Sequence, residues 1–140
     1  MNIHERAATL TLAGFIAAIT NQLLGGFDPH LQALIAFMAV DTILGWLIAI
    51  LKLSDKSPGG RLSSAAGFRG LIKKGCCLLV IVVAVHLDLL IGTNGITRDT
   101  AILAFALNEL LSIVENMGKM GITIPKGIAN ALDTLSDRNK

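Results

Sequence analysis

The feature that most constrains this chain is the apolar run over residues 31–51, which carries one charged residue, Asp41, at its centre. About 20 apolar residues in helical form span the ~30 Å hydrocarbon core of a bilayer, so the run predicts a transmembrane helix. An aspartate at mid-span costs about 2.5–3.5 kcal/mol on insertion, which roughly 0.3–0.6 kcal/mol from each surrounding large apolar residue offsets. The helix should therefore still insert, and Asp41 needs a polar partner or water.

Composition extends this prediction to the whole chain. Of 140 residues, 53% are hydrophobic and 16% are charged, whereas soluble domains average about 25% charged residues. We expect one integral membrane domain over residues 1–140. The adjacent Cys76 and Cys77 match neither a disulfide framework nor a zinc pattern, and we interpret them as buried apolar residues, with lipidation or redox sensing as the alternative.

Three further segments resemble the 31–51 run. Residues 7–26 carry no charge, and the turn Gly25–Pro29 joins them to the next helix as a helical hairpin. An uncleaved first helix is favoured over a signal peptide, because the run exceeds a usual signal core. Gly14 and Ala18, spaced four residues apart, predict a face that lets another helix approach closely, although small residues are also simply tolerated in membrane helices.

The expected fold is an all-α integral membrane protein. It is a four-helix bundle with three or four transmembrane helices and a short amphipathic C-terminal helix. The predicted helices cover about 5–25, 30–52, 63–92, 99–118 and 125–136, with Ser63 or Ser64 as a cap. The fourth helix either spans the membrane or lies in its interface.

A basic loop separates the second and third spans. Residues 52–74 hold six Lys and Arg residues against Asp55 alone, and we assign Arg61, Arg69, Lys73 and Lys74 to lipid headgroups rather than to nucleic acid. If all four segments span, eleven cations lie on one side and Arg98 lies on the other. The positive-inside rule then places both termini in the cytoplasm. An interfacial fourth segment would leave the C-terminus outside.

The fourth segment carries a polar stripe within an arc of roughly 120° on a helical wheel. With Asp41 it makes a set of intramembrane polar residues that could line a pore: Asp41, Asn108, Glu109, Ser112, Glu115 and Asn116. Three interpretations stay open: a hydrogen-bond network within one protomer, a water-lined surface exposed on oligomerisation, and a proton relay. Gly45, one turn from Asp41 on the same face, leaves room for a neighbouring helix, for which Asn108 and Glu109 are the expected contacts.

No constellation of catalytic residues and no Gly-rich phosphate loop is evident in the sequence. We therefore predict no enzymatic activity, no cofactor and no metal site. His86 and Asp88 could form half a metal site, but residues at i and i+2 of a helix point about 200° apart and would not converge on one ion.

Several motifs occur in an order that resembles the toxin secretion/phage lysis family of bacteriophage holins. They are Asp41-Thr42-Ile43-Leu44-Gly45, Ser63-Ser64, Gly67-Phe68-Arg69-Gly70-Leu71-Ile72-Lys73-Lys74, His86-x-Asp88, Asn108-Glu109-x-x-Ser112-Ile113-x-Glu115-Asn116 and Gly121-x-x-Ile124-Pro125. Together they extend over well more than half of the chain, whereas the first span shows little beyond hydrophobicity.

The resemblance implies a small phage or prophage protein of the bacterial inner membrane, without enzymatic activity or cofactor. Its partners would be membrane lipids, copies of itself and, in some systems, an antiholin. Its lesions would release an endolysin or a toxin or dissipate the membrane potential. Replacing Glu109 and Glu115 by Leu should then block lysis without blocking insertion. The alternatives are an antiholin or regulatory subunit, and a small ion channel or transporter subunit.

Overall fold

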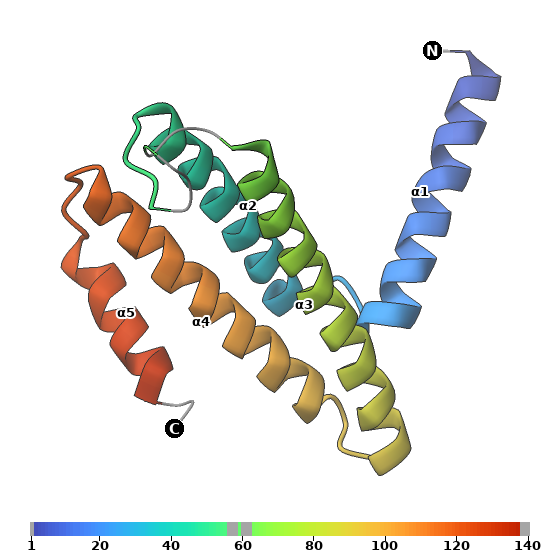
Figure 1. Ribbon diagram of the computed structural model, residues 1–140. Coiled ribbons are helices and arrows are strands. Elements are labelled where there is room, and N and C mark those ends of the chain that lie inside the picture. Colours follow the sequence, from blue (N-terminus) through green and yellow to red (C-terminus); the bar gives the residue numbers. More distant parts are fainter. Residues whose placement is uncertain (1, 56–58, 60–62, 138–140) are drawn as a thin grey trace.

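The computed structural model describes residues 2–55, 59 and 63–137, and within them the chain forms five helices and no strands. They are α1 (Ile3–Leu24), α2 (Pro29–Ile50), α3 (Ser64–Ile91), α4 (Ile96–Lys119) and α5 (Lys126–Asp137), as Figure 1 shows. The first four are long and apolar enough to cross a membrane. The all-α membrane fold is thus confirmed, and α4 meets the length and composition of a span.

Local sequence explains where the helices begin and end. Asp28 caps α2 by accepting a hydrogen bond from the Leu31 backbone at 3.0 Å, and Pro29 occupies the first turn. Ser63 caps α3, accepting from the Ala66 backbone at 3.4 Å. Gly92 ends α3 in the left-handed conformation that only glycine adopts without strain. Helix α4 begins at Ile96, three residues before the predicted start.

The helices share two ends. At the basic end, defined by Ile3, Ile50, Ser64 and Lys119, α1 begins, α2 ends, α3 begins and α4 ends. At the Arg98 end lie the α1–α2 turn and the α3–α4 turn.

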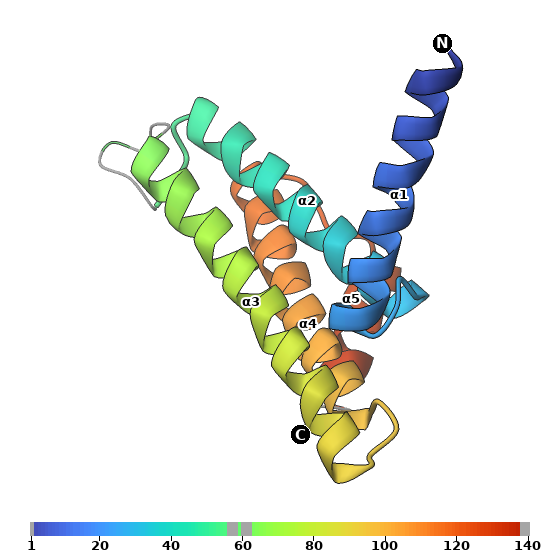
Figure 2. The same ribbon diagram turned by 90° about the vertical axis from the view of Figure 1, so that its right-hand side faces the viewer.

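The packed unit consists of α2, α3 and α4, and its core lies toward the Arg98 end (Figures 1 and 2). Leu31 and Leu34 of α2, Ile81 of α3 and Ile102 of α4 are almost fully buried. Cys77 is half-buried beside this core, but Cys76 is exposed. The prediction that both thiols are buried is therefore wrong for Cys76, which faces outward one residue further round the helix.

Helix α1 stands away from this packed unit. Figures 1 and 2 show it leaving the Arg98 end and diverging from the other helices toward its N-terminus. Every described residue from Asn2 to Ile19 is exposed. Helix α5 folds back beside α4 (Figure 1) and is exposed over most of its described residues.

Candidate functional site

The charged residue of the first apolar run lies in a cluster that joins the three packed helices. The Lys74 ammonium of α3 donates to Asp41 Oδ2 of α2 at 2.9 Å and also to Glu109 Oε2 of α4. Asn116 Nδ2 donates to the second Asp41 oxygen, Oδ1, at 3.1 Å. We call Asp41, Lys74, Glu109 and Asn116 the Lys74 cluster.

The Lys74 cluster is largely buried and lies between the apolar core and the basic end. The side chains of Lys74, Asp41 and Glu109 are 15%, 13% and 9% exposed. Each lies about nine or ten residues from its helix terminus at the basic end. At 1.5 Å per residue this is about 15 Å along each helix, and the exposed Lys73 lies at the same level of α3. Asn116 lies three residues from the end of α4. Because these side chains are largely removed from water between the helices, each charge there needs a partner.

Charge in the cluster is unevenly matched, since one ammonium faces two carboxylates. With all three groups ionised, the net charge is −1. Lys74 is the ammonium that binds both carboxylates, so its positive charge offsets the repulsion between them. Removing one member of a buried ion pair typically costs about 3–5 kcal/mol, because the remaining charge is left without a partner. Lys74 thus stabilises the packing of α2, α3 and α4, which we call the closed arrangement.

A cavity of about 610 Å³ lies between α2 and α3 on the basic side of this cluster. Asp41 and Lys74 line its inner part, and Ser54, Ser63 and Ser64 line it near the basic loop. Small residues leave this space open: Gly45 and Ala49 on α2, and Ala66, Gly67 and Gly70 on α3. The cavity connects the level of the basic loop with the Lys74 cluster.

A second polar cluster joins the α1–α2 turn to α4 at the Arg98 end. The Arg98 guanidinium donates to Asp28 at 2.7 Å and to Asp99 at 2.9 Å. It also donates to the backbone carbonyls of Leu24 at 2.6 Å and Gly26 at 3.1 Å. The α1–α2 turn is thereby tied to the start of α4. The hydrogen bond from Arg98 holds the pKa of Asp28 below its ordinary value, against the opposing effect of partial burial.

Asp88 secures the same end from α3. Its carboxylate accepts the backbone N–H groups of Thr97 at 2.9 Å and Arg98 at 2.8 Å, and it also accepts the Thr93 hydroxyl. These amides belong to the first turn of α4, so Asp88 caps that helix from outside it. His86 instead contacts the carbonyl of Val82 through Nδ1 at 2.8 Å and is exposed. The two side chains do not converge.

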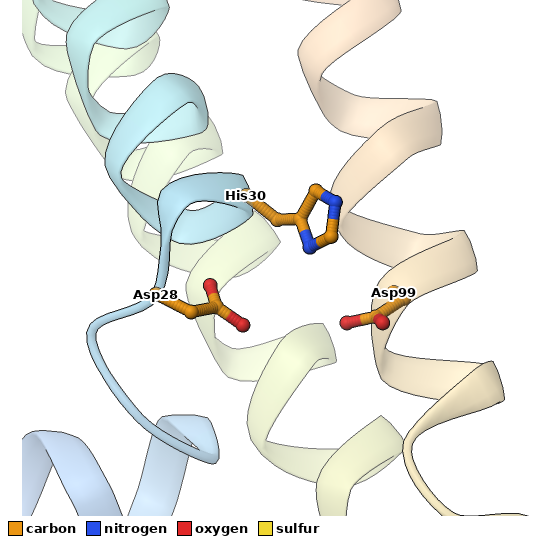
Figure 3. A group of neighbouring side chains, drawn as sticks. All are labelled: Asp28, His30 and Asp99. Carbon is orange, nitrogen blue, oxygen red and sulfur yellow. The ribbon is translucent and has the colours of Figure 1, made fainter.

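Asp28, His30 and Asp99 form a group with the composition of a metal site (Figure 3). Their potential ligand atoms lie within 4.8 Å of one another. Both carboxylates already bind the Arg98 guanidinium. This fixed positive charge disfavours a cation at the same place, and we assign no metal to the group.

The predicted polar stripe of α4 divides between two faces. Glu109 and Asn116 are buried in the Lys74 cluster and Ser112 is half-buried, whereas Asn108 and Glu115 are exposed. Asn116, rather than the expected Asn108, is the amide that reaches Asp41.

Lys74 is the cluster residue that the sequence prediction placed elsewhere. The basic loop sequence predicts that Lys74 binds lipid headgroups, but its ammonium binds two carboxylates inside the bundle. Arg69 and Lys73 are exposed near the basic end, and Arg61 lies outside the described residues. A signal for Lys74 was present, because it recurs at helical spacing with the buried Ile81 and Val85 of α3.

The residues predicted to pack helices also have different positions. Gly45 lines the cavity beside Asp41. Gly14 and Ala18 lie on the exposed α1, and a Cβ atom at Gly14 would meet no atom within 4 Å.

Comparison with known proteins identifies relatives along most of the chain. A family model described as the bacteriophage holin family matches residues 18–137. An uncharacterised protein of Listeria monocytogenes is 37% identical over 121 residues, covering 86% of this chain and 81% of its own. A protein of Bacillus phage phi105 named "Probable holin" is 28% identical over 121 residues, covering 86% and 84%.

A further relative, an uncharacterised protein of Bacillus subtilis, is 32% identical over 136 residues, covering 96% of this chain and 90% of its own. No solved structure matches the chain. The family model covers the packed helices, both polar clusters and α5. The resemblance to holins is thus confirmed, and the chain belongs to the bacteriophage holin family.

Proposed function

We propose that this protein is a holin that assembles in the bacterial cytoplasmic membrane and opens lesions there. The lesions release an endolysin or toxin, or dissipate the membrane potential. Family membership and four helices of spanning length support a holin-type membrane function. The proposed orientation puts the basic end in the cytoplasm, as the distribution of Lys and Arg favours.

The observation that carries the proposal is the Lys74 cluster, which joins α2, α3 and α4. While α2, α3 and α4 stay together, Lys74 binds both carboxylates and holds them away from lipid. Separation of these helices exposes two carboxylates, an ammonium and an amide to their surroundings. Water must then replace the lost partners, and a protomer facing lipid cannot supply it.

Assembly lowers this cost. When several protomers open toward one another, their exposed clusters share a single body of water. The cavity between α2 and α3 reaches the cluster from the basic loop, which gives water a short route from the cytoplasm. Opening is thus favoured by protein number, which explains how a holin can accumulate before it acts.

The test changes the charge balance of the closed cluster. Lys74→Met leaves two carboxylates without their ammonium, so lysis should begin earlier than in the wild type. Glu109→Gln leaves one ammonium paired with one carboxylate, so lysis should begin later. Culture turbidity is followed after induction in a bacterium that also makes a cytoplasmic endolysin, at matched levels of membrane-inserted protein.

Lys73→Met is the matched control, since Lys73 is adjacent, exposed and outside the cluster. Lys74→Met combined with Asp41→Asn and Glu109→Gln should lose the early onset, because no unpaired carboxylate remains. Equal timing for Lys73→Met, Lys74→Met and Glu109→Gln would refute the role of the cluster. Absence of lysis with delay of a partner holin would indicate an antiholin, and ion conductance without endolysin release would indicate a channel.

A further inference from the structure

One face of α4 points out of the protomer and carries polar groups within a candidate span. Its residues, which we call the outer α4 face, are Asn108, Leu111, Glu115 and Gly118, all exposed. They recur every three or four residues and lie within about 80° of arc, as in a helix–helix seam. Among the described residues, the side chains of Asn108 and Glu115 have no hydrogen bond or ion pair. Asn108 lies eleven residues from the end of α4 at the basic end, and an unpartnered amide at that depth is costly in hydrocarbon, so a partner helix would stabilise this face.

Helix α1 carries a face that fits such a partner. Its residues, which we call the small α1 face, are Ala7, Thr11, Gly14, Ala18 and Asn21, all exposed. They also recur every three or four residues within about 80° of arc. Small side chains allow two helix backbones to approach closely, and hydroxyl and amide groups form hydrogen bonds across such contacts.

The two faces match in depth and in charge when the helices are antiparallel. Helix α1 begins and α4 ends at the basic end. Gly14 and Asn108 then lie at the same depth, about 16 Å from their helix ends. Arg6 and Glu115 also share one level near the basic end, and neither side chain has a partner among the described residues. Arg6 flanks the small α1 face, so its long side chain can reach the Glu115 carboxylate.

The small α1 face cannot cover the outer α4 face of the same chain. The Leu24 carbonyl at the end of α1 accepts a hydrogen bond from Arg98, and Gly25 turns the chain with φ 73°. From this joint α1 diverges from the packed helices, with α4 on the far side of α3 in Figure 1. Helix α1 of a second copy is free of this constraint.

We propose that α1 of one copy docks antiparallel onto the outer α4 face of a second copy. Each copy then offers α1 to one neighbour and α4 to another. Such a head-to-tail contact closes into a ring or extends as an open array. The inference rests on the proposed function, for which it supplies the contact between copies.

Cysteine cross-linking in membranes tests the contact. In a background with Cys76→Ala and Cys77→Ala, Thr11→Cys is combined with Leu111→Cys, because both positions lie eight residues from the basic ends of their helices. Oxidation should give a ladder of dimers, trimers and larger species on a non-reducing gel. Leu12→Cys with Leu111→Cys is the matched control, since Leu12 lies on the opposite side of α1, and it should give several-fold less ladder.

Three results would overturn the contact: an equal ladder from the Leu12 control, a disulfide within single chains, or dimers from either single-cysteine variant. Charge reversal gives a second measurement. Arg6→Glu or Glu115→Arg alone should reduce the ladder several-fold, and the two together should restore it. If the double variant inserts normally but does not restore the ladder, the Arg6–Glu115 pairing is refuted.

The same strains separate this inference from the proposed function. A ladder in cells that never lyse would support the contact and refute lesion formation. Lysis at the normal time with no ladder from the Thr11–Leu111 pair would refute the contact and leave the proposed function standing.

Discussion

At the scale of single residues, Gly25 makes the turn from which α1 diverges. Its φ of +73° is unfavourable for other residues by about 1–2 kcal/mol. A Cβ atom there would lie 2.8 Å from Arg98 Nε. Gly25→Ala should therefore lower the free energy of unfolding by about 2 kcal/mol, measured by reversible unfolding in mixed detergent micelles. Gly75→Ala is the control, since its Cβ would meet no atom within 4 Å and alanine favours the helix. Equal stability of the two variants would contradict this account.

Asp28 makes the same joint sensitive to pH. Because Arg98 lowers its pKa, the folded state favours the ionised carboxylate, and this contribution is complete above the ordinary value of 3.8. It is lost as the pH falls through the lower pKa of the folded state. Asp28→Asn should thus unfold at lower denaturant concentration than the wild type at pH 6, and the difference should shrink below pH 3.8. A difference independent of pH would show that ionisation of Asp28 contributes nothing.

At the scale of helices, α4 begins where another helix provides its cap. Gly95 precedes α4 and offers no side-chain cap, and the buried Asp88 of α3 accepts the first amides instead. Asp88→Ala should destabilise the protein by about 1–2 kcal/mol. It should also speed amide hydrogen exchange at Thr97 and Arg98. His86→Ala, two residues away and exposed, should leave both measurements unchanged, and an equal effect of the two substitutions would argue against capping by Asp88.

The helices were predictable from sequence because their signals are local. Long apolar runs set the spans, and Asp28, Pro29 and Ser63 mark starts that need only neighbouring residues. The polar candidates Asp41, Glu109 and Asn116 were also identifiable, since polar residues inside apolar runs stand out. Their pairing was not, because Lys74 lies 33 residues from Asp41 and 35 from Glu109. Such contacts depend on how the helices rotate against one another.

The divergence of α1 was beyond prediction for the same reason. The sequence favours four similar spans in one bundle, and nothing local distinguishes a packed α1 from a free one. The direction of α1 depends on Arg98, which lies more than 70 residues from Leu24 and Gly26 in the sequence and binds both of their carbonyls. The cap of α4 by Asp88 also crosses a turn, and the sequence pattern of His86 and Asp88 gave no indication of it.

At the scale of the whole molecule, head-to-tail assembly predicts that few defective copies stop many intact ones. A chain with Arg6→Glu keeps its outer α4 face, so it can join an array through α4. Its α1 is repelled by Glu115 of the next copy, so the array stops growing there. If each defective copy ends one array, the mean number of copies in an array falls to about the reciprocal of the defective fraction. About one tenth of Arg6→Glu protein, co-expressed with the wild type, should delay lysis far more than a one-tenth loss of active protein.

The combined Arg6→Glu and Glu115→Arg protein provides the control. Its α1 repels the wild-type α4 and its α4 repels the wild-type α1, so it joins wild-type arrays at neither end and assembles with itself. At the same one-tenth fraction it should leave the onset of lysis nearly unchanged, as measured by culture turbidity at matched total protein. Equal delays from the single and the combined variant would mean that copies do not assemble through α1 and α4. A delay from the single variant alone would show that the length of the array, and not merely the amount of protein in the membrane, sets the time of opening.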